Sequence, residues 1–222
     1  MGRINIDVYV MVHNEEMLLP YFLRHYSSFA RRIIAFEDQS TDRSREILET
    51  HPLVTVIEPE LHGINEKYWT STLWPMYEEY SRGYADYVIQ VDLDEFIYHP
   101  RLVDVLQEEK HKSIQQIFCP GFTMITDKLP STSGQIYDEI KLGLPDRWSS
   151  KWAVFSPDIH LRFGDGRHKV AETTATSCNV HSGIKILHYR WLGQAYFEER
   201  DRRNRLRFNV HDKVDLPYNP NT

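Results

Sequence analysis

The first half of the chain alternates short runs of β-branched and aromatic residues with longer amphipathic segments. The runs with the composition of buried strands are 4–12, 31–36, 53–57 and 84–92. The segments between them, at about 15–28, 40–50 and 66–82, carry apolar residues at helical spacing. Connections of this length join parallel strands, because a hairpin needs only a few residues. The order predicts an α/β fold with a mostly parallel sheet flanked by helices.

Polar side chains follow three of these predicted strands. They are His13, Asn14 and Glu15 after the first strand, Glu37 and Asp38 after the second, and Asp92 and Asp94 after the fourth. Right-handed crossovers bring the carboxyl ends of parallel strands to one edge, where open α/β sheets bind their ligands. We therefore expect a polar site at this edge. Neither GxGxxG nor GxxxxGK[ST] follows a strand, which argues against a dinucleotide-binding or P-loop enzyme.

Asp92 and Asp94 are the most informative of these residues. Two positions apart on extended backbone, their carboxylates point to the same side and repel each other unless a cation lies between them. Oxygen ligands with open positions suit Mg²⁺ or Mn²⁺. The alternative is a strand that ends in an acidic, solvated turn. For the adjacent Glu95, we expect an ordinary residue at a helix start rather than a third ligand.

The second half has a less regular pattern. It predicts a helix at 102–109, strands at 113–119, 152–155 and 183–189, and a mobile loop over much of 121–141. A last helix is expected at 194–208, where acids alternate with arginines in the manner of a solvated helix face. Residues 212–222, with two prolines, are expected to form a tail or linker.

Charge and cysteine content exclude several classes of function. The net charge of −6 does not favour nucleic acid as a partner. The two cysteines form no CxxC pattern, so neither a disulfide framework nor a zinc site is indicated. No apolar run has the length of a transmembrane segment, and the start of the chain enters a strand directly instead of resembling a signal peptide. A cytoplasmic location is the expectation.

Taken in order, several segments resemble the GT-A glycosyltransferases, most closely the family 2 and family 92-like members. These segments are 11–16 (MVHNEE), 37–42 (EDQSTD), 91–96 (VDLDEF), 151–154 (KWAV), His168 and 187–189 (LHY), and they extend over most of 4–205. The resemblance implies the GT-A (nucleotide-diphospho-sugar transferase) fold, with a Rossmann-like sheet and a smaller mixed C-terminal part. It implies one catalytic domain at 1–211, with a nucleotide-binding half at about 1–98 and an acceptor half at about 99–211.

The resemblance also implies roles for individual residues. Asp92 and Asp94 match the DxD motif, which holds Mn²⁺ or Mg²⁺ against the diphosphate of a nucleotide sugar, and His188 matches a late histidine that completes the metal site. The same His188 could instead be a structural histidine at the end of a core strand. The substrate-binding positions implied are Val12, Asn14 and Glu15 in the nucleoside pocket, Asp38 at the base, and Lys151 and His168, which match recurrent positions without an assigned role.

The function implied is transfer of a sugar from a nucleoside diphosphate sugar, with UDP favoured, to a hydroxyl of a glycan or other glycoconjugate acceptor, with inversion expected. One alternative is a metal-dependent nucleotidyltransferase or phosphohydrolase, although such enzymes of related fold carry a glycine-rich basic loop where 13–16 (HNEE) stands here. The other is a non-catalytic carbohydrate-binding module of a larger protein. Each of these functions is compatible with further domains in a longer natural chain.

The catalytic base is the least determined part. Family 2 enzymes carry an acidic pair before a late helix, and this chain has no clear counterpart. Asp158, in the polar second half, is the first candidate, while Asp138 and Glu139 fall in the predicted loop. Trp148 is the best candidate for an acceptor platform, because helical or strand spacing places most of the other tryptophans in the core.

Overall fold

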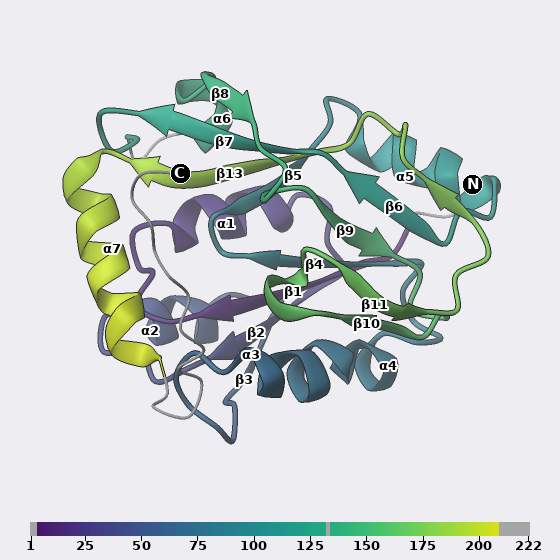
Figure 1. The fold of residues 1–222 in the computed structure, drawn as a ribbon, viewed down its shortest axis with the longest axis horizontal. Helices are drawn as coiled ribbons and strands as arrows, with labels where there is room; N and C mark the ends of the chain where they lie inside the picture. Colours follow the sequence, from purple (N-terminus) through teal and green to yellow (C-terminus); the bar gives the residue numbers. More distant parts are fainter. Residues whose placement is uncertain (1–3, 132–133, 209–222) are drawn as a thin grey trace.

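The computed structural model of the chain describes residues 4–131 and 134–208, and within them a seven-stranded sheet forms the centre of the molecule (Figure 1). The strand order is β12-β6-β9-β4-β1-β2-β3. The bounds are β1 Ile6–Val12, β2 Arg32–Glu37, β3 Val54–Ile57, β4 Tyr87–Asp92, β6 Gln116–Cys119, β9 Lys151–Phe155 and β12 Cys178–Asn179. The four strands β4-β1-β2-β3 are parallel, whereas β9 runs antiparallel to both of its neighbours.

The register of the central strands aligns their carboxyl ends. Met11 on β1 pairs with Asp92 on β4, and Val12 pairs with Glu37 on β2. The polar residues after each strand therefore start from the same level of the sheet. This confirms the predicted parallel α/β arrangement, and it places the acidic residues at one edge.

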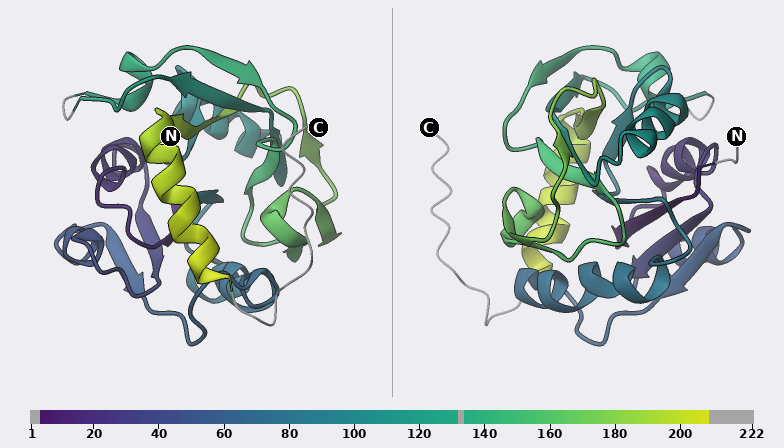
Figure 2. Two further views of the ribbon diagram at one scale, coloured as in Figure 1. Left: turned by 60° about the vertical axis from the view of Figure 1, so that its left-hand side comes forward. Right: turned by 90° about the vertical axis from the view of Figure 1, so that its right-hand side faces the viewer.

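Helices cover both faces of this sheet (Figure 2). Their bounds are α1 Leu19–Tyr26, α2 Ser44–Glu49, α3 Glu66–Tyr68, α4 Tyr77–Tyr80 and α5 Leu102–His111. A π-helical turn and a 3₁₀ turn join α3 to α4, so 66–80 is one irregular helical segment. Val8 and Val10 of β1 pack with the core on the side of α1 and α5, and Tyr9 packs with Trp74 and Tyr77 on the other side. Burial on both faces is typical of parallel sheets.

A second sheet, of order β5-β13-β7-β8, extends from the end of β4. Its strands are β5 Glu95–Tyr98, β7 Gly121–Thr126, β8 Gly143–Pro145 and β13 Lys185–Leu192, and the remaining small elements are α6 Ile136–Glu139 and the hairpin of β10 Leu161–Phe163 with β11 Val170–Thr173. The antiparallel pairing of β13 with β5 places His188 opposite Glu95. This pairing joins the late histidine to the acidic cluster.

Two expectations about local structure are wrong. Parts of 121–141 form β7 and α6 instead of a mobile loop, because pairing of β7 with β13 orders the start of a segment whose two glycines and one proline indicate a loop; residues 132–133 of that segment lie outside the described residues. Glu95 begins β5 rather than a helix, and it is fully buried. The predicted tail at 212–222 lies outside the described residues.

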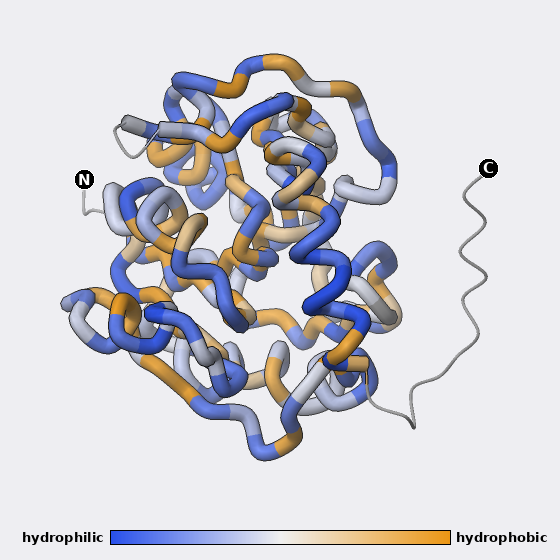
Figure 3. The backbone as a smooth tube through the Cα atoms, turned by 90° about the vertical axis from the view of Figure 1, so that its left-hand side faces the viewer, coloured by the Kyte–Doolittle hydropathy of each residue, from blue (hydrophilic) through white to orange (hydrophobic). Residues whose placement is uncertain are grey.

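Helix α7 (Gln194–Arg207) runs along the carboxyl edge of the central sheet, where it appears as a long hydrophilic stretch in Figure 3. Along its described length it has no fully buried residue. Its ends are fixed by backbone hydrogen bonds, from Gly193 N to the carbonyl of Thr126 and from Ile64 N to the carbonyl of Arg207. Within the described part of the chain, no helix is long and apolar enough to cross a membrane.

Candidate active site

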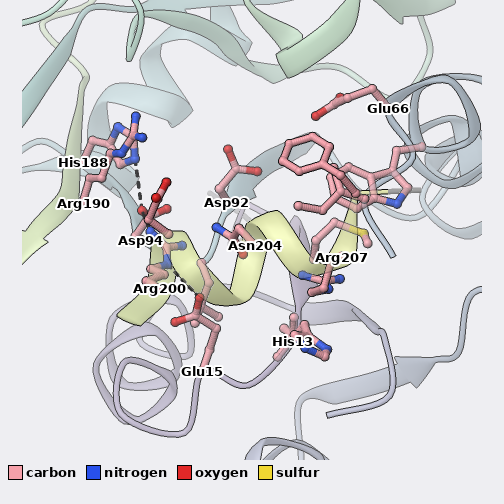
Figure 4. A pocket seen from close by; sticks show the side chains of 17 residues that line it. His13, Glu15, Glu66, Asp92, Asp94, His188, Arg190, Arg200, Asn204 and Arg207 are labelled. Atoms are coloured by element: carbon pink, nitrogen blue, oxygen red, sulfur yellow. Dashed lines mark hydrogen bonds and ion pairs between the residues drawn. The ribbon is translucent and has the colours of Figure 1, made fainter. Parts of the chain in front are cut away.

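A pocket of about 390 Å³ opens at the carboxyl ends of β1 and β4 (Figure 4). Its walls come from the end of β1 and the residues after it (Met11–His13 and Glu15), residues of 64–69, Asp92–Asp94, the end of β13 and the inner face of α7. The volume lies within the range of small-molecule sites. Acidic and basic side chains both line it, and five separate parts of the chain supply them: the end of β1, α3, the end of β4, β13 and α7.

Asp92 is held at the pocket by two cations. Its Oδ2 lies 2.9 Å from Nζ of Lys151 and its Oδ1 lies 2.5 Å from Arg167, while its side chain remains 43% exposed. Glu95 supports the arrangement from behind, because its carboxylate accepts from the Asp92 backbone N–H at 3.0 Å and lies 2.6 Å from Lys151. Burial alone would raise the pKa of the Asp92 carboxyl, but Arg167 and Lys151 outweigh it and hold this pKa well below its usual range.

Arg167 was not assigned a role from the sequence, yet with Lys151 it is one of the two buried cations that contact Asp92. Its guanidinium lies 4.4 Å over the ring of Trp74, and within the described residues its Nη1 has no hydrogen-bond partner. Gly166 and Arg167 both have positive φ, 62° and 58°, so the turn between β10 and β11 aims the side chain inward. In the sequence, the only sign of this turn is the glycine that precedes Arg167, and a single glycine is a weak signal.

Asp94 is almost completely buried and is also paired. Its Oδ2 lies 3.1 Å from Nε2 of His188 and accepts a hydrogen bond from Arg200 of α7. Burial would raise the pKa of Asp94, but Arg200 and His188 lower it well below its usual value. Burial likewise lowers the pKa of His188, and the Asp94 carboxylate more than offsets this, so the pKa of the imidazole is raised.

The second ring nitrogen of His188 faces away from the pocket. Nδ1 lies 2.8 Å from the Ser149 hydroxyl, which donates to the Asp146 carboxylate at 2.6 Å. Neither Ser149 nor Asp146 was identified from the sequence, because no motif marks a serine that contacts a residue 39 positions away.

Three arginines on one face of α7 bind strand-end groups. Their spacing of three and four residues places them on the same side of the helix. Arg200 contacts Glu15 at 2.9 Å as well as Asp94, Arg203 donates to the Asn14 carbonyl, and Arg207 donates to the Asp38 carboxylate. The expectation of a solvated helix face is therefore wrong for this side of α7, since the three-and-four spacing is hidden in a run of charged residues.

The predicted nucleoside-binding residues are divided between the pocket and its supports. Val12 and Glu15 line the pocket, but the Asn14 side chain accepts from the backbone N–H groups of Thr41 and Asp42 at 2.6 and 3.2 Å and so holds the turn that precedes α2. Asp38 is buried beside the pocket. Its carboxylate accepts from the Gly63 backbone N–H and lies next to His62 and Arg207, each of which is within hydrogen-bond distance.

The structure does not bring Asp158 into this site. Because β9 runs antiparallel to β4, Phe155 pairs with Val88, and Asp158 follows it beyond the amino end of β4. Four residues of strand, about 13 Å, separate Val88 from Asp92. Strand direction in this part of the chain cannot be determined from composition, so the sequence does not reveal this separation. Acidic residues that line the pocket outside the Asp92–Asp94 segment are Glu15, Glu66 and Asp201.

His168 and Trp148 form a separate rim. Their rings meet edge to face with centroids 5.7 Å apart, and Trp148 is 61% exposed. Arg147 lies 5.0 Å from the Trp148 ring. An exposed aromatic ring with a histidine beside it offers a flat apolar surface with a polar edge.

The residues at Asp94 fit a divalent cation only in part. Among the described residues, no group of three or more His, Cys, Asp or Glu side chains is arranged to hold a metal ion. The Asp94 carboxylate and His188 Nε2, 3.1 Å apart at the pocket wall, are separated as two ligands of one ion would be. Mg²⁺ and Mn²⁺ commonly take one or two protein ligands and complete their shell with phosphate oxygens and water. The donor set thus fits such an ion together with a diphosphate, whereas both oxygens of Asp92 already contact cations.

No family model matches the sequence, and no curated protein matches it. Solved structures of TarS from S. aureus are similar in fold. One TarS structure gives a TM-score of 0.53 at 12% identity, over 84% of this chain and 37% of that chain. TarS 1–349 in complex with UDP-GlcNAc gives 0.51 at 13% identity, over 92% of this chain and 66% of that one, and its complex with UDP gives 0.51 at 14% identity, over 84% and 60%.

The likeness to TarS confirms the GT-A fold expected from the sequence, with a mostly parallel mixed central sheet and a smaller mixed sheet. At this level of identity it is evidence of fold alone. This chain spans 37–66% of the lengths of these three TarS chains.

Proposed function

We propose that this chain is a glycosyltransferase of the family 2 type that moves a sugar from a nucleoside diphosphate sugar, UDP favoured, to a hydroxyl of a glycan or glycoconjugate acceptor. The observation that carries the proposal is the pocket at the carboxyl ends of β1 and β4, where Asp94, His188 and Arg200 meet. The same fold in TarS has been solved with UDP and with UDP-GlcNAc. Ligands of open α/β sheets bind at this edge.

The donor would lie across the pocket with its nucleoside against Val12, Ile64 and Trp69. These residues form an apolar wall beside Asp38, whose carboxylate is already oriented by the Gly63 N–H and Arg207. A carboxylate fixed in this way can accept a hydrogen bond from the base without losing conformational freedom. The diphosphate would then reach Asp94 and Arg200.

A divalent cation, Mn²⁺ or Mg²⁺, held by Asp94 and His188 would offset the charge that develops on the departing diphosphate. Arg200 has a matching role. In the ligand-free arrangement its guanidinium neutralises Asp94 and Glu15, and its planar fork suits phosphate oxygens equally well. We propose that Arg200 turns toward the diphosphate once a cation compensates Asp94.

Asp92 has a different role in this proposal from the one expected from the DxD motif. Lys151 and Arg167 engage its oxygens, so it is a weak candidate for a direct ligand. Its exposed edge can accept a hydrogen bond from a hydroxyl of the donor. Its lowered pKa makes it a poor general base, because efficient proton transfer requires a pKa near the working pH. The inverting outcome stays a prediction.

The test is calorimetry of UDP and GDP with and without Mn²⁺. We expect UDP to bind more tightly with Mn²⁺, and Asp94→Asn to abolish the effect of the metal. Asp158→Asn is the matched control, since that residue lies beyond the amino end of β4, and it should bind as the native protein does. Absence of nucleotide binding, or equal binding in Asp94→Asn, would refute the proposal.

A further inference from the structure

We infer that Ser149 and Asp146 are positioning residues that hold the His188 imidazole with its proton on Nδ1 and its Nε2 directed at Asp94 and the pocket. The inference deepens the proposed function, because a cation at Asp94 needs the free Nε2 lone pair. Its geometric part stands without that function, since it concerns which nitrogen donates to which partner.

The loop between β8 and β9 is built to fix the two residues. Asp146 accepts at Oδ1 from the Trp148 N–H at 2.9 Å and at Oδ2 from the Thr123 hydroxyl at 2.9 Å. Ser149 is buried, and the chain crosses it so closely that a Cβ on Gly121 would lie 2.2 Å from the Ser149 carbonyl carbon. Only glycine permits this approach. The loop therefore presents the Ser149 hydroxyl in one place.

The direction of the hydrogen bonds follows from counting protons. The Ser149 hydroxyl has one proton and donates it to Asp146 Oδ2 at 2.6 Å. Burial would raise the pKa of Asp146, but the donors Ser149, Trp148 and Thr123 lower it, so the carboxyl stays an acceptor. Ser149 Oγ can then only accept from His188, whose Nδ1 lies 2.8 Å away.

Nδ1–H of His188 thus donates outward to Ser149, and Nε2 is left for the pocket. Without a cation, a proton on Nε2 completes the ion pair with Asp94 at 3.1 Å. With a cation, the same nitrogen offers its lone pair. A histidine ligand that donates its other ring N–H to a fixed acceptor is held in tautomer and orientation, and loss of that acceptor typically lowers metal affinity about 10–100-fold.

Mn²⁺ affinity, measured by electron paramagnetic resonance in the presence of UDP, tests the inference. We expect Ser149→Ala to weaken Mn²⁺ binding about 10–100-fold. Ser150→Ala is the matched control, because Ser150 Oγ bonds to Gly121 N and the Asp146 carbonyl in the same loop but not to His188. The Mn²⁺ affinity of Ser150→Ala should stay within about threefold of that of the native protein. Equal affinities in the two variants, whether both native-like or both weakened, would overturn the inference.

A second measurement is independent of metal and of catalysis. Long-range ¹H–¹⁵N spectra of the metal-free protein should show a protonated, exchange-protected Nδ1 on His188 in the native protein and in Ser150→Ala. In Ser149→Ala the protection should be lost. An unprotonated Nδ1 in the native protein would overturn the inference. Failure of Mn²⁺ to bind the native protein would instead refute the proposed cation site, and the spectra would still decide the proton position.

Discussion

The Arg200 guanidinium on α7 and the Asp94 carboxylate after β4 form an ion pair across 106 residues of chain, and the same arginine contacts Glu15. Through this pair a helix without any fully buried residue along its described length closes one side of the pocket. The position of α7 therefore depends on these ion pairs as well as on the packing of Tyr196 against the main core. Ligands that change the charge at Asp94 should also change how firmly α7 is held.

Removal of Arg200 should destabilise the protein in a way that metal reverses. Arg200→Gln leaves the buried Asp94 carboxylate without its strongest partner, at a cost of roughly 2–4 kcal/mol. Mn²⁺ with UDP should recover part of this loss by compensating Asp94. Arg202→Gln, on the exposed face where Arg202 pairs with Glu199, should leave the free energy of unfolding almost unchanged, because solvent screens an exposed ion pair. Urea denaturation with and without Mn²⁺ and UDP measures both, and equal losses in the two variants would contradict the account.

Lys151 and Glu95 should be strongly coupled. Both are buried with 2.6 Å between Nζ and Oε1, and each compensates the other beneath Asp92. A double-mutant cycle with Lys151→Met and Glu95→Gln should give a coupling free energy of roughly 1–3 kcal/mol. The exposed pair Arg43–Glu46 is the control, and its coupling should be much smaller because solvent screens it. A Lys151–Glu95 coupling as small as the control would show that the buried ion pair does not hold the site together.

The stability of the fold should fall in mild acid because of His25. Burial lowers the pKa of this imidazole to about 4, and a neutral Nε2–H donates to the Ile97 carbonyl at 3.0 Å. The unfolded chain, with an ordinary histidine pKa of about 6.5, binds the proton first, so the stabilising contribution is complete above that pH and is lost as pH falls toward 4. The loss amounts to about 3 kcal/mol over this window.

His25→Gln tests this prediction, because glutamine can keep the donor to Ile97 without titrating. Its free energy of unfolding should change less between pH 7 and pH 5 than that of the native protein. His111→Gln, at an exposed position on α5, should retain the native pH dependence. If the free energy of unfolding of His25→Gln kept the full pH dependence of the native protein, a group other than His25 would be the cause of the acid destabilisation.

Trp148 should contribute to acceptor binding and not to stability. It is 61% exposed, its ring contacts His168 edge to face and lies 5.0 Å from the Arg147 guanidinium, and its backbone N–H bond to Asp146 survives substitution. Trp148→Ala should raise the acceptor KM about 3–10-fold, as expected for loss of an aromatic contact, and leave UDP affinity unchanged. Leu142→Ala, equally exposed on another segment, is the control. An unchanged acceptor KM would remove Trp148 from the site.

The sequence predicted the parallel half of the fold because local periodicity determines it. Strands and helices alternate with clear spacing up to Asp92, and polar residues at the strand ends mark the edge where the pocket opens. The register of β1 with β4 then places Met11 and Asp92 at one level, as expected. The late His188 also reaches Asp94, an arrangement implied only by the family resemblance.

The rest depends on contacts that sequence pattern does not encode. The antiparallel direction of β9 moved Asp158 away from the pocket, and pairing of β13 with β5 and β7 ordered segments that resemble a loop or a turn. The arginines of α7 and the Ser149–His188 contact join residues far apart in the chain, with no local motif to mark them. Long-range pairing of charges is visible only in three dimensions.

Release of UDP from nucleotide sugars tests the central claim most directly. A panel of UDP-sugars should be incubated with the native protein and Mn²⁺, with and without a mixed glycan acceptor, and UDP should be quantified. The account predicts release from at least one donor, faster with acceptor, and at least about 100-fold slower in Asp94→Asn, since loss of charge stabilisation at a leaving group typically costs this much. Release from no UDP-sugar, or release at the native rate in Asp94→Asn, would contradict it.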